Sequence, residues 1–223
     1  MTANIAHEIK NPLVIIGGFT KRLAKKMQND HTENRYISII LNEVGRLETI
    51  LSEILHYVKE SQPFEESCRL QDFLEDILYI LSSDPAWEAI TIIKDFDQEL
   101  EPVDCDSQQL KQVFINLLMN AFEAMHGTGN ISVKVRKVMH DGMPFAAASI
   151  TDTGGGIDPA IIDNIFNPFF TTKERGTGLG LAISNKIVTN HKGHIEVENV
   201  AGKGVTFIIY LPMKNIMQQE ELT

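Results

Sequence analysis

The stretch Ala147–Asp158, "AASITDTGGGID", passes from small and β-branched residues into three consecutive glycines. Its first five residues predict a strand. Glycines have no Cβ, so the turn that follows lets the backbone approach a bound molecule closely. Asp152 stands at the junction, where its carboxylate could accept a hydrogen bond from an exocyclic amine such as that of adenine. The stretch favours a sheet with a ligand site at its end, although the same residues would also suit an ordinary glycine-rich turn.

The sequence around this stretch alternates between strand and helix patterns. We expect strands at Thr91–Phe96, Ile131–Val138, Ala147–Thr151, His194–Glu198 and Thr206–Leu211, where β-branched or alternating residues occur. Helical periodicity marks Asp72–Leu81, Gln108–Met125 and Gly178–His191. Because strands and helices interleave, residues 63–213 are predicted to form one α/β layered domain. Residues 214–223 are expected to be a solvated C-terminal tail.

Residues 1–62 show a different, purely helical pattern. From Ile37 to Val58 the apolar residues recur in steps of three and four, which is a heptad seam. An earlier apolar series runs from Ile5 to Met27, and the polar stretch Gln28–Asn34 separates the two. This organisation predicts an antiparallel helical hairpin. A lone hairpin cannot cover both seams, so we expect two copies to form a dimeric four-helix bundle.

Composition narrows the partners and the compartment. A net charge of −10 disfavours binding to nucleic acid or to anionic membranes. No long apolar run or basic leader is present, which favours a cytoplasmic chain without membrane contact. Cys68 and Cys105 lack metal-ligand spacing, and we expect two buried thiols more readily than a disulfide, although a disulfide stays open. Because the helical pattern is already running at Asn4, we expect the chain to be a fragment of a longer protein.

His7 lies in the first helical series, next to Glu8. It is two residues from both Ile5 and Ile9, or about 200° around a helix, so it faces away from the apolar stripe. A solvent-facing imidazole is largely neutral at pH 7 and can attack an electrophile while an adjacent carboxylate takes its proton. Pro12 removes one helical hydrogen bond and bends the helix just beyond this pair. The alternative is an idle surface histidine.

Two further motifs would suit a nucleotide. Asn116 and Asn120 are four apart, which places their amides on one face of a helix. Neutral oxygen ligands combined with phosphate oxygens suit Mg²⁺. The stretch Glu174–Ser184, "ERGTGLGLAIS", is a glycine-rich turn entering a helix, where free N–H groups can bind phosphate. It matches neither the Walker loop nor the dinucleotide fingerprint. Asn167–Thr177 before it is predicted to be a mobile lid, with Lys173 available for phosphate oxygens.

Together, "HEIKNPL", "NLLMNAFEAM", "DTGGGID", "NPFFTTK" and "GTGLGL" resemble the catalytic core of two-component sensor histidine kinases. In chain order they are similar to the H, N, G1, F and G2 boxes of that family, and the variants look most like its nitrogen-regulation (NtrB-like) branch. The resemblance covers about residues 2–212. It implies a dimeric phosphoacceptor hairpin joined to an α/β sandwich of the gyrase/Hsp90/histidine kinase/MutL type. It also implies ATP and Mg²⁺ as cofactors, a homodimer, and a response-regulator receiver domain as partner.

The resemblance also implies roles for single residues. His7 would be the phosphoacceptor, Glu8 its general base, and Asn11 the residue that positions water for dephosphorylation of the regulator. For the nucleotide, the implied contacts are Asn116 and Asn120 at Mg²⁺, Asp152 at the adenine amine, and Gly154, Gly156, Lys173, Gly176, Thr177, Gly178, Leu179, Gly180 and Thr206 around them. One position departs from the family, because Glu123 stands where many members carry a basic residue near the phosphates.

Three functions remain open at this point. The first is an ATP-dependent protein-histidine kinase that also acts as a phosphatase of its phosphorylated regulator. The second is an ATP-hydrolysing conformational machine of the gyrase, Hsp90 and MutL kind. Those proteins carry a glutamate four residues before the metal-binding asparagine, whereas this chain has Asn116 there. The third is a non-catalytic dimeric scaffold with a relic nucleotide pocket.

Overall fold

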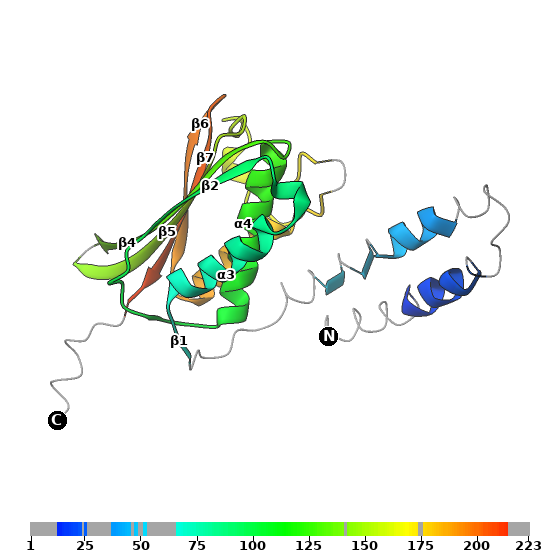
Figure 1. Cartoon of the computed structure of the whole chain (residues 1–223), viewed down its shortest axis with the longest axis horizontal. Coiled ribbons are helices and arrows are strands. Elements are labelled where there is room, and N and C mark those ends of the chain that lie inside the picture. The colour runs from blue at the N-terminus through cyan, green and yellow to red at the C-terminus, as the bar shows by residue number, and fades with distance from the viewer. Residues whose placement is uncertain are drawn as a thin grey trace. The chain divides into compact units, whose positions relative to one another are not determined.

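The computed structural model describes most of the second domain and part of the first. The described residues are 13–23, 25, 37–45, 47–48, 51–52, 66–140, 142–173 and 176–213. Contacts divide the chain into two compact units, Met1–Ser61 and Gln62–Thr223, and Figure 1 shows the helices of the first and the mixed layers of the second. The predicted domain boundaries at 62/63 and 213/214 stay predictions. Each unit is described by itself.

In the first unit, residues 13–23 and 37–45 are helical, as the apolar periodicity predicts. The two segments touch, since a Cβ on Gly17 would lie 3.2 Å from a methyl carbon of Val44. Among the described positions of the predicted heptad seam, Ile37, Val44 and Leu51 are buried. The intervening Ile40 and Leu47 remain 45% and 42% exposed. The described part of the seam thus consists of one row of buried side chains and one row of exposed side chains.

The second unit is built on a five-stranded mixed sheet with the order β2-β4-β5-β7-β6. The strands are β2 (Ile90–Phe96), β4 (Gly129–His140), β5 (Met143–Asp152), β6 (His194–Val200) and β7 (Gly204–Pro212). Only the pair β2–β4 is parallel. Each predicted strand is found. The ends at Phe96 and His194 are as predicted, and the other ends lie one to four residues further out. Glycine and proline have low β propensity, which explains the shorter prediction at Gly129, Gly204 and Pro212.

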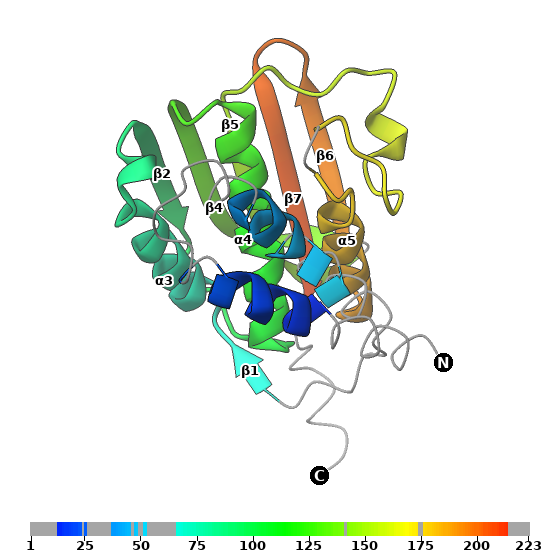
Figure 2. The ribbon, with the colours of Figure 1, turned by 90° about the vertical axis from the view of Figure 1, so that its right-hand side faces the viewer.

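Three helices cover one face of this sheet: α3 (Leu70–Ser82), α4 (Ser107–Ala124) and α5 (Gly180–Asn190), as Figure 2 shows. The N-cap of the central helix α4 is Asp106, whose carboxylate accepts a hydrogen bond from the N–H of Gln109 at 3.0 Å. Such an N-cap satisfies one of the free donors of the first turn. The apolar face of α4 includes Phe114 and Leu118, which are fully buried. The predicted α/β sandwich is confirmed.

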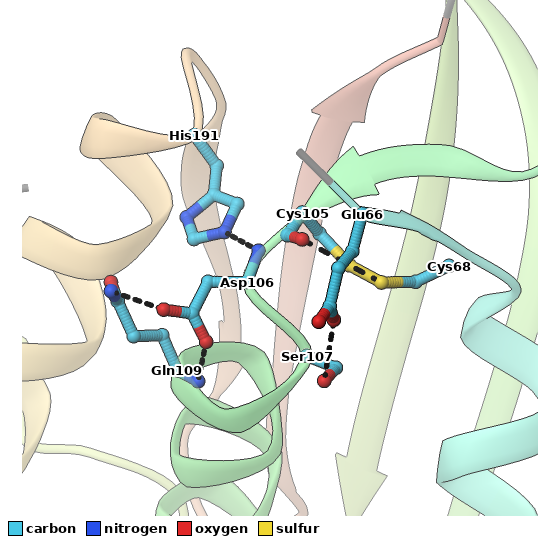
Figure 3. Close-up of a disulfide and its surroundings, with 7 residues drawn as sticks. All are labelled: Glu66, Cys68, Cys105, Asp106, Ser107, Gln109 and His191. Atoms are coloured by element: carbon cyan, nitrogen blue, oxygen red, sulfur yellow. Dashed lines mark hydrogen bonds between the residues drawn. A yellow bond between two sulfur atoms is a disulfide. The ribbon is translucent and has the colours of Figure 1, made fainter. Parts of the chain in front are cut away.

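Two three-residue strands were not predicted. β1 (Glu66–Cys68) pairs antiparallel with β3 (Val103–Cys105) to form a separate small sheet. A disulfide joins Cys68 to Cys105, with their Cα atoms 6.2 Å apart (Figure 3). The expectation of two buried thiols is therefore wrong, because the pairing of two very short strands brings the cysteines together. Three residues are too few to show the alternation that marks a strand.

Two short 3₁₀ turns complete the second unit, η1 (Pro85–Trp87) and η2 (Ile162–Asn164). Within the part of the chain that the structure describes, no helix is both long and apolar enough to cross a membrane.

Candidate functional site

Asp152 is the last residue of β5 and is buried, with 6% of its surface exposed. Its Oδ1 accepts a hydrogen bond from the N–H of Gly154 at 2.8 Å, and the carboxylate also accepts from the N–H of Val205. Burial raises the pKa of the Asp152 carboxyl above its ordinary value, and the two N–H donors oppose that rise. A buried carboxylate with fixed orientation is suited to reading one donor of a ligand.

The glycine turn after Asp152 is held between α4 and the β6–β7 hairpin. A Cβ on Gly154 would lie 3.0 Å from the carbonyl oxygen of Ala124, at the end of α4. Gly156 has φ +74°, and a Cβ there would lie 2.9 Å from the carbonyl oxygen of Val200. Both sites therefore require glycine, for close approach at the first and for the left-handed backbone at the second.

Asn199 clamps the far end of this turn and was not predicted. Its Oδ1 accepts from the N–H of Ile157 at 2.8 Å, and its Nδ2 donates to the carbonyl of the same residue at 2.7 Å. The available signal is its place in β6, where Ile195, Val197 and Asn199 alternate along one face. A polar side chain at the third apolar position of such a row indicates a specific hydrogen-bond partner.

Thr206 lies on the other face of the sheet from Asp152. It is in register with Thr151, and the two hydroxyl oxygens are 2.9 Å apart. Successive residues of a strand point to opposite faces, so the side chain next to that of Asp152 belongs to Val205. The strand's alternation therefore turns the side chain of Thr206 away from the buried carboxylate, and its expected place near the adenine stays a prediction.

Asn116 and Asn120 project from α4 toward different partners. The Nδ2 of Asn116 donates to the hydroxyl of Ser184 on α5 at 2.9 Å, and Ser184 is 1% exposed. A Cβ on Gly180 would lie 2.4 Å from the Oδ1 of Asn116, so a larger residue there would have to displace that side chain. Asn116 thereby joins the two helices. The Oδ1 of Asn120 instead accepts a hydrogen bond from the ammonium group of Lys173 at 2.8 Å.

The second glycine turn closes tightly on the lid segment. Gly178 has φ +69°, and its carbonyl accepts from the N–H of Phe169 at 2.9 Å. A Cβ on Gly178 would lie 2.4 Å from the carbonyl carbon of Phe169. A Cβ on Gly176 would lie 2.5 Å from the hydroxyl of Thr171. The turn and the lid therefore form one folded loop, with the side chain of Phe169 65% exposed on it.

The first turn of α5 presents free backbone N–H groups next to this loop. Leu179 is its N-cap and is 1% exposed, and no side chain caps the helix there. The hydroxyl of Thr177 accepts from the N–H of Leu179 at 3.3 Å. The N–H groups of the first helical turn have no intrahelical acceptors and carry the positive end of the helix dipole. An anion such as phosphate fits this end.

A cation already lies against α4 at the same place. The ammonium group of Lys173 bonds Asn120 and also forms an ion pair with Glu123. Among the described residues, no three or more His, Cys, Asp or Glu side chains converge in a way that could hold a metal. Magnesium at Asn120 would therefore take further oxygen atoms from water or from the phosphates of a ligand such as a triphosphate. His7, Glu8 and Asn11 lie outside the described residues.

The fold and the two glycine turns define an ATPase domain of the type shared by histidine kinases, DNA gyrase B and HSP90. Residues 105–215 match the family described as "Histidine kinase-, DNA gyrase B-, and HSP90-like ATPase". Residues 1–63 match the "His Kinase A (phospho-acceptor) domain". The chain is 33% identical to the signal transduction histidine-protein kinase AtoS of Escherichia coli (strain K12) over 213 residues, which are 96% of this chain and 34% of AtoS.

Solved structures agree with these matches. The histidine kinase ThkA, crystallised with the response regulator protein TrrA, is 38% identical with a TM-score of 0.67, and the match covers 96% of this chain and 61% of ThkA. The catalytic domain of ThkA alone is 34% identical with a TM-score of 0.59, covering 68% of this chain and 96% of that domain. The chain belongs to the histidine kinase family. It spans about a third of AtoS.

Proposed function

We propose that this chain is the catalytic core of a sensor histidine kinase. It transfers the γ-phosphoryl group of ATP to His7 and from there to an aspartate of a response-regulator receiver domain. The observation that carries the proposal is the position of α4, which contacts both glycine turns, at Ala124–Gly154 and at Asn116–Gly180. One helix thereby gathers a buried carboxylate, two amides and an anion-binding helix start around one site. The family membership and the ThkA–TrrA complex support the same function.

Each element of the site has a proposed contact with the nucleotide. Asp152 accepts a hydrogen bond from the adenine amine, with Gly154 and Gly156 giving the base room. The backbone of Gly176–Gly180 and the first turn of α5 bind the phosphates. Asn120 holds Mg²⁺ together with phosphate oxygens, and Asn116 supports it by fixing α5 against α4. The metal, when bound, neutralises phosphate charge. Lys173 is a further phosphate contact supplied by the lid.

The transfer itself requires positioning and charge neutralisation rather than elaborate covalent chemistry. One imidazole nitrogen of His7 attacks the γ-phosphorus, and the bond from that phosphorus to the bridging oxygen breaks, leaving the electron pair on ADP. Glu8 takes the proton from the other imidazole nitrogen. In a second reaction, the hydrolysis of the phosphorylated regulator, Asn11 positions the attacking water.

The finer assignments rest on sequence motifs and exposed surface. The variants "HEIKNPL" and "NAFEAM" favour the NtrB-like branch. A homodimer through the first unit is supported by its exposed apolar side chains, among them Ile16 and Phe19 at 49% and 61% exposure. With a net charge of −10 we propose no contact with nucleic acid or membrane for this part of the protein, and a cytoplasmic location.

An ATP-hydrolysing machine is the weaker candidate. Such a machine needs a general base for water, and in this chain that position holds Asn116, an amide already bonded to Ser184. An amide does not accept a proton at neutral pH. Steady release of phosphate without any phosphoprotein would favour that candidate, and failure to bind AMPPNP with Mg²⁺ would favour a non-catalytic scaffold.

The test is incubation with γ-labelled ATP and Mg²⁺, followed by mapping of the phosphorylated residue. We expect an acid-labile, base-stable label on His7 that is absent from the His7→Gln variant, because only the imidazole can accept it. The variant should still bind AMPPNP, measured by calorimetry, since His7 is not part of the nucleotide site. Label that persists in His7→Gln would contradict the proposal.

A further inference from the structure

We propose that Asn120 and Glu123 together form the cation site of this pocket, and that the ammonium group of Lys173 occupies it until a divalent metal takes its place. Glu123 thereby becomes an oxygen donor on the metal side of the pocket, bonding the metal directly or through one of its waters. The inference rests on the proposed function, since the metal is the one that accompanies the nucleotide.

The geometry places two oxygen donors side by side. Asn120 and Glu123 are three residues apart on α4, so their side chains share one face of the helix. The ammonium group of Lys173 lies 2.8 Å from the Oδ1 of Asn120 and is ion-paired with Glu123. The side chains of Lys173 and Glu123 are 46% and 49% exposed, so solvent ions can reach both.

The same two oxygens suit a hard divalent cation. Mg²⁺ binds carboxylate and amide oxygens at about 2.0–2.1 Å and completes its octahedron with water or phosphate oxygens. An ammonium group 2.8 Å from the Oδ1 of Asn120 would then face the metal across a single oxygen atom. Two positive charges that close repel each other strongly. Metal and lysine must therefore exchange, and the exchange leaves Lys173 free to move toward the phosphates.

This exchange explains the acidic residue at position 123. A carboxylate beside a triphosphate is repulsive unless a cation lies between them, and here a cation is present in either state. The simpler explanation is a surface ion pair that only anchors the lid, and exposed pairs of this kind contribute little free energy. The two explanations differ in sign. If Glu123 only anchors Lys173, removing the charge of Lys173 or of Glu123 releases the Asn120 amide from the ammonium group and strengthens metal binding. If Glu123 is a metal donor, its removal weakens metal binding.

The experiment titrates the whole chain with Mn²⁺ as the probe metal, in the absence of nucleotide. Free Mn²⁺ is measured by electron paramagnetic resonance, and the bound site is located by broadening of the Asn120 side-chain amide in a nitrogen-15 NMR spectrum. We expect Lys173→Met to bind Mn²⁺ about three- to fivefold more tightly than wild type, and Glu123→Gln to bind it weaker by a similar factor. Methionine and glutamine keep the length of the side chains while removing their charges.

The chain contains a matched control pair. The ammonium group of Lys137 lies 3.3 Å from the carboxylate of Glu101, with exposures of 46% and 45%. Lys137→Met and Glu101→Gln make the same changes in net charge away from the site, so they measure the effect of charge alone. The proposed site requires Lys173→Met and Glu123→Gln to exceed these controls and to act in opposite directions.

Three results would overturn the inference: shifts in the same direction, shifts no larger than those of the controls, or no broadening of Asn120 in Lys173→Met. A parallel calorimetric titration of wild type with AMPPNP and Mg²⁺ separates this from the proposed function. If the nucleotide binds while the variants behave like the controls, only the cation exchange is wrong. If wild type binds no nucleotide, the proposed function itself fails.

Discussion

At the scale of single residues, the two buried titratable side chains Asp152 and His191 make different kinds of contact. Asp152 faces the site with its charge partly compensated by two backbone N–H groups. His191 lies at the other end of the helical layer, where its Nε2 accepts the N–H of Asp106 at 3.0 Å. Its Nδ1 is 2.7 Å from the carbonyl of Ile187, so the neutral imidazole donates there. We propose that Asp152 binds the nucleotide, whereas His191 holds the backbone at the start of α4.

Asp152→Asn is expected to keep the fold and lose nucleotide. Burial raises the pKa of Asp152, so ionising it costs the folded state free energy as the pH rises through that raised value, and asparagine removes this cost. The adenine amine loses its charged acceptor, which lowers AMPPNP affinity by about ten- to a hundredfold. Calorimetry measures the affinity and thermal unfolding checks the fold. Asp158→Asn, on the same turn with its side chain bonded only to Ala160 in the described contacts, is the matched control.

Wild-type binding by folded Asp152→Asn would contradict the assigned role. A variant that melts far below the control would show instead that the carboxylate is needed to hold the turn, through its bonds to Gly154 and Val205.

His191 predicts an acid-sensitive fold. Burial lowers its pKa, with the carbonyl of Ile187 and the charge of Asp106 opposing that change. The unfolded state therefore binds a proton before the folded state does, so this contribution to stability is complete above about pH 6.5 and is lost as the pH falls through the lowered pKa. Urea unfolding at about pH 5 and about pH 7.5 should show the loss, and His191→Gln should flatten the difference. An equal pH dependence in His191→Gln and wild type would exclude this cause, with His126→Gln as the control.

At the scale of elements, the small β1–β3 sheet depends on its covalent bond. Three residue pairs join the strands, which is too few for a two-stranded ribbon to be stable alone. The disulfide between Cys68 and Cys105 closes a stretch with a sequence separation of 37. The hydroxyl of Ser107 also donates to the carboxylate of Glu66 at 3.3 Å across the same junction, as Figure 3 shows.

Removing this bond should lower stability under oxidising conditions. Loop closure over a separation of 37 residues corresponds to about 4 kcal/mol in the unfolded-state entropy account. Cys68→Ser/Cys105→Ser should therefore unfold at lower denaturant than oxidised wild type, and the two should converge when wild type is treated with a dithiol reductant. A reducing cytoplasm would open the bond in the same way. Two cysteines that react with an alkylating agent in the folded, oxidised protein would contradict the disulfide.

At the scale of the whole molecule, long patterns were readable in the sequence and short ones were not. All five strands of the main sheet and its three helices follow from periodicities that extend over many residues. β1 and β3 are too short to show any period, and their pairing depends on a contact across 37 residues. The same distinction holds in the site. Asp152 and the glycine turns are marked by local chemistry, whereas the clamp by Asn199 depends on a partner 42 residues away.

The side chain of Thr206 shows why a local motif alone cannot place a residue on one face of a sheet. Thr206 stands in a recognisable motif, but which neighbour of a strand faces the pocket is decided by the sheet register, here Thr151 opposite Thr206. Likewise Glu123 can be recognised as unusual from the sequence, but its partner Lys173 cannot be predicted because it is 50 residues away. The hairpin's uncovered row, Ile40 and Leu47, is visible only once the segments are packed.

The disulfide also decides how a mechanical load would pass through the second unit. The chain enters this unit at β1, and the bond from Cys68 reaches Cys105, directly before the cap of α4 at Asp106. Tension on the entering chain is therefore carried by a covalent bond and does not pull apart the three residue pairs of β1 and β3. It reaches the chain directly before the first turn of the helix that carries Asn116 and Asn120.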